Sequence, residues 1–159
     1  MNRRYLLVLA ALLPFVGHAQ SVDPTGPQPA LPKEQLAIVT RDGGKHDFTV
    51  EMALKTEQQT VGEMFRTSVP ADSGMLFDWG MSRESQMWMK NTLVPLDMVF
   101  IKSDGTIRAI AENTVPQSLA VIDSHGPVRA TLELQGGITA KLGIRVGDRV
   151  QQRLFGNAP

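Results

Sequence analysis

One stretch in the middle of the sequence gathers several side chains that could recognise a ligand. Residues 87–97 read Met-Trp-Met-Lys-Asn-Thr-Leu-Val-Pro-Leu-Asp. An extended strand would place Trp88 and Lys90 on one face, because successive side chains alternate. Together with the polar side chains of Asn91 and Thr92, they form a candidate binding site for a small polar or anionic ligand.

Asp97 ends this stretch inside an apolar run, Leu96 to Ile101. A carboxylate in such surroundings must be hydrogen-bonded or protonated. The favoured interpretation is structural: Asp97 accepts backbone N–H bonds from the Asn91-Thr92 turn and fixes its geometry. The alternative is that Asp97 belongs to the binding site.

Arg66 directly follows a predicted short helix. A cation there would complement the helix dipole by about 0.3–1 kcal/mol, and this role, or an internal Arg66–Asp97 pair, is the favoured interpretation. The functional alternative is a clamp for an anion or carboxylate formed with Lys90, since a guanidinium offers a planar fork for bidentate pairing.

The composition excludes several other kinds of chemistry. The chain has no cysteine, so disulfides, thiol catalysis and cysteine-ligated zinc are excluded. Met87 and Met89 have the spacing of a strand-borne copper pair, but methionines at apolar positions are typical of core packing. His46 and His125 lie far apart without metal-ligand spacing. We therefore expect no metal and no cofactor.

The N-terminus has the order of a secretory signal peptide: two arginines, the apolar run Tyr5 to Val16, and small residues up to Ala19. The run is too short for a permanent membrane span of about 20 residues. We predict a signal peptide at 1–19, a flexible proline-rich leader at 20–34, one globular domain at 35–155 and a tail at 156–159. The mature protein would be periplasmic or secreted.

The charge balance argues against nucleic acid as a partner. Without residues 1–19 the chain keeps 14 basic and 16 acidic residues, whereas phosphate neutralisation needs a concentrated basic surface.

The remaining pattern predicts a small α+β domain that is mainly β. Alternating or apolar runs indicate short strands joined by local hairpins, with one or two short helices. Val128, Ala130, Leu132 and Leu134 should face the core, and Arg129 and Glu133 should face outward or into a polar site. We expect an antiparallel-rich, barrel-like sheet, because closure would remove exposed edges. The predicted strands and helices cover the segments 36–39, 46–55, 75–79, 86–91, 96–114 (a hairpin), 128–134 and 149–155, with helices after Thr56 and within 136–142.

Five strings resemble the bacterial and archaeal domain-of-unknown-function family 192: EQQTVGEMFR (57–66), PADSGMLFDW (70–79), MWMKNTLVPLDMVFI (87–101), ENTVP (112–116) and TLELQGGITAKLGIRVGDRV (131–150). The resemblance implies a compact β-rich domain and no particular activity. The polar positions of the family pattern fall on Arg66, Lys90, Asn91, Thr92, Asp97 and Glu133. The family's usual leucine-methionine pair is Glu63-Met64 here, from which we expect a wetter helix end before Arg66.

Three functions remain open from the sequence. The leading hypothesis is a non-catalytic envelope module that binds a small polar or anionic ligand, or a protein partner, through Arg66 and the 88–97 segment. The second is a hydrolase of envelope glycans that uses a pair among Asp97, Glu112 and Glu133. The third is an accessory module for other envelope proteins, recognisable by a large exposed apolar patch.

Overall fold

The computed structural model describes residues 23–158. The predicted signal peptide, the first residues of the predicted leader and Pro159 lie outside the described residues. The elements are, in chain order, β1 (Lys33–Val39), β2 (Lys45–Ala53), α1 (Thr56–Val61), β3 (Ser73–Met87), β4 (Leu96–Ile101), β5 (Ile107–Ala111), β6 (Ile122–Gln135), α2 (Ile138–Leu142), β7 (Arg149–Gln151) and the 3₁₀ helix η1 (Arg153–Phe155).

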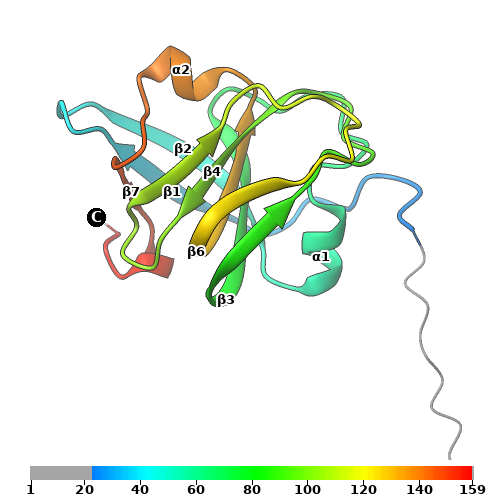
Figure 1. The fold of residues 1–159 in the computed structure, drawn as a ribbon, viewed down its shortest axis with the longest axis horizontal. Coiled ribbons are helices and arrows are strands. Elements are labelled where there is room, and N and C mark those ends of the chain that lie inside the picture. Colours follow the sequence, from blue (N-terminus) through cyan, green and yellow to red (C-terminus); the bar gives the residue numbers. More distant parts are fainter. Residues whose placement is uncertain (1–22, 159) are drawn as a thin grey trace, which may run out of the picture.

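The seven strands form one sheet in the order β5-β4-β6-β3-β2-β1-β7. Neighbouring strands are antiparallel except β2 and β3, which run parallel. The sheet curls strongly (Figure 1), and backbone hydrogen bonds between residues 105–107 and 147–150 bring its two edges together. The prediction of a mainly β, antiparallel-rich, barrel-like domain with short helices is confirmed.

Strand β6 lies near the centre of the sheet, between β3 and β4. The four apolar residues predicted to face the core are fully buried: Val128, Ala130, Leu132 and Leu134. Thr131 and Glu133 on the opposite face are buried as well. A second apolar cluster packs there around Met98 and Phe100, their neighbours on β4, and Gly62, just after α1, lies against Glu133. Glu133 therefore faces a polar site and not the solvent.

The two strands predicted at 75–79 and 86–91 are one long strand, β3, with register irregularities after Asp78 and Glu84. The strand ends at Met87, and the chain then turns, with a hydrogen bond from the Thr92 N–H to the Met89 carbonyl. Asn91 has a left-handed backbone, φ 55°. The predicted alternation of side chains from residue 88 to 91 is therefore wrong.

Helix α1 begins one residue earlier than predicted, because Lys55 and not Thr56 is its N-cap residue. The side chain of Gln58 accepts the N–H bond of Lys55. Residues from the predicted flexible leader lie against this helix: the Gln28 amide donates to the carbonyls of Gln58 and Gly62. Leucine 31 also bonds to the domain through its N–H.

The buried apolar residues of the described chain all lie between Leu36 and Val150. A chain that starts at Gln20 therefore keeps the whole core. Across residues 23–158, no helix combines the length and the apolar character needed to cross a membrane.

Candidate functional site

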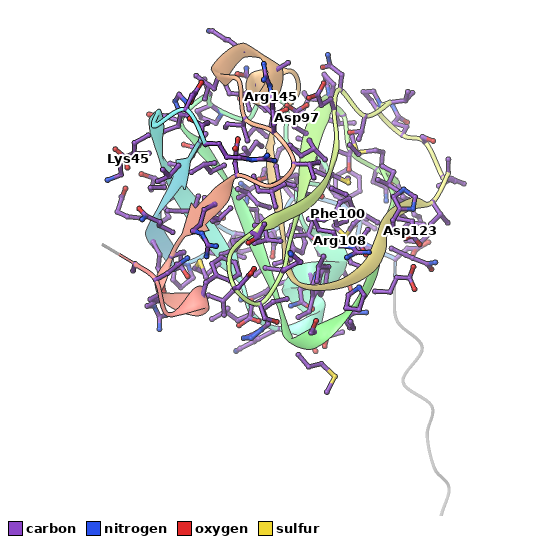
Figure 2. All side chains as sticks on the ribbon, turned by 60° about the vertical axis from the view of Figure 1, so that its left-hand side comes forward. Lys45, Asp97, Phe100, Arg108, Asp123 and Arg145 are labelled. Carbon is purple, nitrogen blue, oxygen red and sulfur yellow. The ribbon has the colours of Figure 1, made fainter. Side chains whose placement is uncertain are left out.

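The six residues predicted to bind a ligand lie in three separate places. Arg66 lines a polar cavity beside β2. Asp97, labelled in Figure 2, is buried beneath α2. The other four lie in the turn that follows β3: Trp88, Lys90, Asn91 and Thr92. The structure does not bring these three places together into one pocket.

Asp97 is fully buried on β4 and accepts four hydrogen bonds. Its Oδ1 accepts from the N–H groups of Asn113 and Gly137, each at 2.8 Å. Its Oδ2 accepts from the N–H of Thr139 at 2.9 Å and from the Thr139 hydroxyl at 2.6 Å. Asp97 therefore fixes the start of α2 and the loop at Asn113. The predicted bonds to the Asn91-Thr92 turn are wrong, because Asn113 and the start of α2 supply the donors.

The turn after β3 is held mainly by contacts with the N-terminal segment and with the segment after α1. Lys90 Nζ lies 2.9 Å from Asp23 and 5.4 Å from the centre of the Trp88 ring. The Asn91 carbonyl accepts the N–H of Phe65, and the Thr92 hydroxyl donates to the Lys90 carbonyl. Lys90 therefore pairs with the N-terminal segment and does not form the predicted clamp with Arg66.

Arg66 forms a bidentate ion pair with Glu51 on β2. Its Nη1 and Nη2 donate to Glu51 Oε1 and Oε2, each at 2.9 Å, and the Leu31 N–H adds a third bond to Oε2 at 2.8 Å. The predicted Arg66–Asp97 pair is wrong. The helix-dipole role is wrong too, because α1 ends at Val61, and the dipole effect is confined to the last turn.

Glu63 lies beside the same guanidinium, and its side chain is buried. Arg66 Nε lies 3.1 Å from Glu63 Oε2, but the geometry of this ion pair does not make a hydrogen bond, so Oε2 has no hydrogen-bond partner among the described residues. The expected wet helix end is wrong, since the chain turns inward after Gly62 and carries Glu63 to 2% exposure. Burial raises the pKa of Glu63 to about 7, although the Arg66 charge opposes this shift.

Glu133 reaches the cluster from β6 on the other side. It is 4% exposed, and its Oε2 also has no hydrogen-bond partner within residues 23–158. Burial, together with the negative charge of Glu63, raises the pKa of Glu133 well above its usual range. Gly62 leaves room for this carboxyl: its φ is 51°, and an added Cβ would lie 3.0 Å from the Phe77 ring and 3.6 Å from Glu133 Oε2.

Glu51 differs from the two other carboxyls. Burial acts to raise its pKa, but the hydrogen bonds from Arg66 and Leu31 outweigh burial and hold the pKa of Glu51 below its usual range. The bond to Glu51 in turn raises the pKa of Arg66. The cluster thus contains one ionised carboxylate paired with one guanidinium, and two carboxyls that hold protons more strongly than usual.

A cavity of about 80 Å³ opens onto this cluster. We call it the Arg66 cavity and define it by its polar lining: Lys33, Thr49, Glu51, Glu63, Arg66, Ser68 and Ser73. Gly74 forms part of its wall, and there β3 lies so close to β6 that an added Cβ would be 2.3 Å from the Glu133 carbonyl oxygen. Glu133 lies behind the lining and does not reach the opening.

Larger cavities elsewhere offer fewer polar side chains that are free to bind a ligand. One of about 240 Å³ lies beside Arg41, Arg145 and Asp148. Asp148 there accepts the backbone N–H bonds of Arg41 and Arg145, at 3.1 and 2.7 Å, so its charge is used to close two loops.

The sequence pattern missed Lys33, Glu51 and Glu63. Glu51 lies in a run where the apolar residues Phe48, Val50 and Met52 alternate with others, and this alternation predicts that Glu51 faces the solvent. Both faces of this part of β2 are buried, which alternation alone does not reveal. The family pattern did single out Arg66 and Glu133, although it gave neither of them its partner.

Replacing Asp97 tests its structural role. Asp97→Ala leaves four donors without their acceptor, at roughly 1–3 kcal/mol for each buried group, so the free energy of unfolding should fall by at least about 4 kcal/mol. Asp97→Asn keeps one acceptor oxygen and should cost less. Urea denaturation of both variants measures this, and an alanine variant as stable as the parent would contradict the role.

Replacing Glu63 tests the buried carboxyls. Its pKa is raised from 4.5 to about 7 in the folded state, so the folded protein holds a proton that the unfolded chain releases in this interval. Stability should therefore fall as the pH rises from 4.5 to 7, by about 3 kcal/mol from Glu63. Glu63→Gln should remove this contribution to the loss of stability with rising pH.

The measurement is the free energy of unfolding at several pH values between 4.5 and 8. Glu112→Gln is the matched control, because Glu112 is exposed, and it should keep the slope of the parent. If Glu63→Gln showed the parent's pH dependence unchanged, the burial of an ionisable Glu63 would be contradicted.

Comparison with known proteins adds the following. The model of a family described as uncharacterized ACR matches residues 37–152. A crystal structure of a candidate transcription regulator from Sinorhizobium meliloti 1021 is 48% identical, with a TM-score of 0.78 over 80% of this chain and 98% of that chain. A protein of unknown function from Novosphingobium aromaticivorans DSM 12444 is 33% identical, with a TM-score of 0.75 over 86% of this chain and 99% of that chain. Among curated proteins none matches the chain.

Proposed function

The chain belongs to the DUF192 family of unknown function, and we propose that it is a non-catalytic binding module that holds a small oxyanion-bearing ligand, such as a carboxylate, in the Arg66 cavity. The observation that carries the proposal is the bidentate Arg66–Glu51 pair placed at the opening of a polar cavity. The N-terminal sequence supports a place for this module outside the cytoplasm.

The charges of the cavity favour an anion. Glu51 and Arg66 neutralise each other, and Lys33 adds a positive charge to the lining. The guanidinium has five N–H donors, of which Glu51 takes two and Glu63 faces a third. The two that remain, with the Lys33 ammonium and the Ser68 hydroxyl, are donors of the kind that bind carboxylate or phosphate oxygens.

Glu63 makes the binding depend on pH. Below pH 7 its carboxyl is mostly protonated, so it presents a donor to the ligand and does not repel it. Above pH 7 the ionised carboxylate repels an anion at short range. The affinity for an anion should therefore increase as the pH falls through 7.

The alternative of glycan hydrolysis gains no support from this cavity. A carboxyl pair for that reaction must flank the bond that is cleaved. Glu133, the second acid near Glu63, lies behind the lining, and Glu51 is held by Arg66. The three acids that the sequence suggested do not all meet, because Asp97 is bonded to α2 and Glu112 is exposed.

The description of the Sinorhizobium relative as a candidate transcription regulator does not change this proposal. With 14 basic and 16 acidic residues after residue 19, the chain lacks the excess of positive charge on which DNA affinity depends.

The proposal is tested with acetate and inorganic phosphate as probes on the chain that starts at Gln20. Nuclear magnetic resonance should show shifts of the Arg66 Nε–H and of the Ser68 and Gly74 amides during titration. Binding should weaken up to about tenfold from pH 6 to pH 8, because the protonated share of Glu63 falls from about nine-tenths to about one-tenth around its pKa of about 7.

Two variants and one control sharpen the test. Glu63→Leu, which restores the family's usual residue, should bind acetate equally at both pH values. Arg66→Lys keeps the charge but loses the fork, and should weaken binding about tenfold. Arg153→Lys is the control, because Arg153 is exposed and pairs with Glu34. The proposal would be contradicted if neither probe shifted the cavity resonances. It would also be contradicted if Arg66→Lys bound the probes as the parent does.

A further inference from the structure

The segment before β1, residues 23–32, lies against the folded domain. We call it the N-terminal strap. The fully buried apolar core of the described chain starts only at Leu36, so the strap adds little to that core. Figure 1 shows the strap in blue, on the side of the molecule where α1 lies. Its contacts fall on the two segments that carry Glu51 and Glu63, which line the Arg66 cavity.

The strap reaches Glu51 through its backbone. The Leu31 N–H donates to Glu51 Oε2 at 2.8 Å, and Arg66 Nη2 donates to the same oxygen. The carbonyl of the next residue, Pro32, accepts the Met52 N–H at 2.9 Å. The strap therefore runs beside β2 and gives Glu51 a donor that Arg66 does not supply. This donor helps to keep both oxygens of Glu51 turned toward the guanidinium.

The strap reaches Glu63 through the peptide group that precedes it. The Gln28 amide donates to the Gly62 carbonyl at 3.0 Å and to the Gln58 carbonyl at 3.1 Å. Gly62 has φ 51° and ψ −131°. A glycine can leave such a conformation for others at little cost, because it has no Cβ. The bond from Gln28 therefore helps to select the conformation that turns Glu63 inward.

The same peptide group also faces Glu133. Its C=O and N–H point to opposite sides, because the peptide bond is trans. The Gly62 carbonyl is turned toward Gln28, and the Glu63 N–H is turned toward Glu133. Burial raises the pKa of Glu133, and the hydrogen bond from this N–H acts against that rise. One contact of the strap therefore bears on the position of both buried acids.

We propose that the N-terminal strap is part of the Arg66 cavity and that Gln28 is a positioning residue, which holds Glu63 in the buried place where it meets a ligand. This inference rests on the proposed function, because it assigns a further residue to the same binding site. Gln28 does not line the cavity and acts through the Gly62 peptide. Without its two bonds, Gly62 takes other conformations and Glu63 gains access to water.

Replacing Gln28 by methionine tests this role, because methionine has a similar length but no N–H donor. Carbon-13 resonances of the Glu63 carboxyl are followed against pH on the chain that starts at Gln20. The midpoint should fall by at least about one pH unit from its value near 7, because water restores part of the hydration that burial removes. A residue that only stabilised the fold would leave this midpoint in place.

The charges around Glu63 are the same in the parent and in Gln28→Met, so a changed midpoint reports position and not a new charge. They come from the four segments packed around it: Lys33 on β1, Glu51 on β2, Arg66 on the segment after α1, and Glu133 on β6.

Two controls accompany this variant. Gln86→Met makes the same change at an exposed glutamine, whose amide donates to Asp123. Asp23→Asn removes the ion pair with Lys90 at the outer end of the strap, and an exposed pair of this kind contributes little. Both should keep the parent's midpoint for Glu63. If either control moved it as far as Gln28→Met does, the effect would not belong to Gln28 and the proposal would be overturned.

The titration contains no ligand, so its outcome is separate from that of the binding test. The positioning role is overturned if Gln28→Met titrates as the parent does, or if the parent's Glu63 already titrates near 4.5. If acetate shifts no cavity resonance of the parent, the proposed function fails, while a lowered midpoint in Gln28→Met still supports the positioning of Glu63.

If the parent binds acetate, Gln28→Met should bind it about twofold more weakly at pH 6. The reason is that a midpoint lowered by about one pH unit reduces the protonated share of Glu63 at this pH from about nine-tenths to about half. An affinity equal to that of the parent at pH 6 would overturn the link between the strap and the ligand.

Discussion

The placement of one half-buried guanidinium among three buried carboxyls is the constraint around which this part of the fold is arranged. The Arg66–Glu51 pair ties the segment after α1 to β2, while Glu133 approaches from β6. Buried ion pairs contribute little net stability, because the loss of hydration offsets the attraction. Glu63 and Glu133 add cost, since each has an oxygen without a hydrogen bond within the described chain. This low net stability is one of the reasons for the proposed binding role of the cluster.

Asp97 provides the contrast within the same molecule. It is as deeply buried as Glu133, yet four donors from Asn113, Gly137 and Thr139 satisfy both of its oxygens. A carboxylate bonded in this way organises a loop and a helix start and has no capacity left for a ligand. The comparison separates a buried carboxylate whose hydrogen bonds are all satisfied from Glu63, which has an unsatisfied oxygen and lines a cavity.

The sequence predicts the architecture better than the site. Alternation in β6 marks the core residues Leu132 and Leu134 correctly, because half-buried strands follow a period of two. For Glu133 it leaves two outcomes open, solvent or a polar site, and the polar site is found because a curled sheet covers both faces of a central strand. The strand predicted at 86–91 ends at Met87, because Asn91 takes a left-handed backbone conformation that no local sequence pattern requires. The pairing of Arg66 with Glu51 depends on the order of the strands in the sheet, and this order cannot be read from a single sequence.

The central claim is that Glu51, Glu63 and Glu133 share one site but differ in their affinity for protons. Carbon-13 resonances of the side-chain carboxyls, followed against pH, measure each of them separately. We predict a midpoint near 7 for Glu63, one well above the usual glutamate range for Glu133, and one below that range for Glu51. Three carboxyls that all titrate near 4.5, the ordinary value for glutamate, would contradict it.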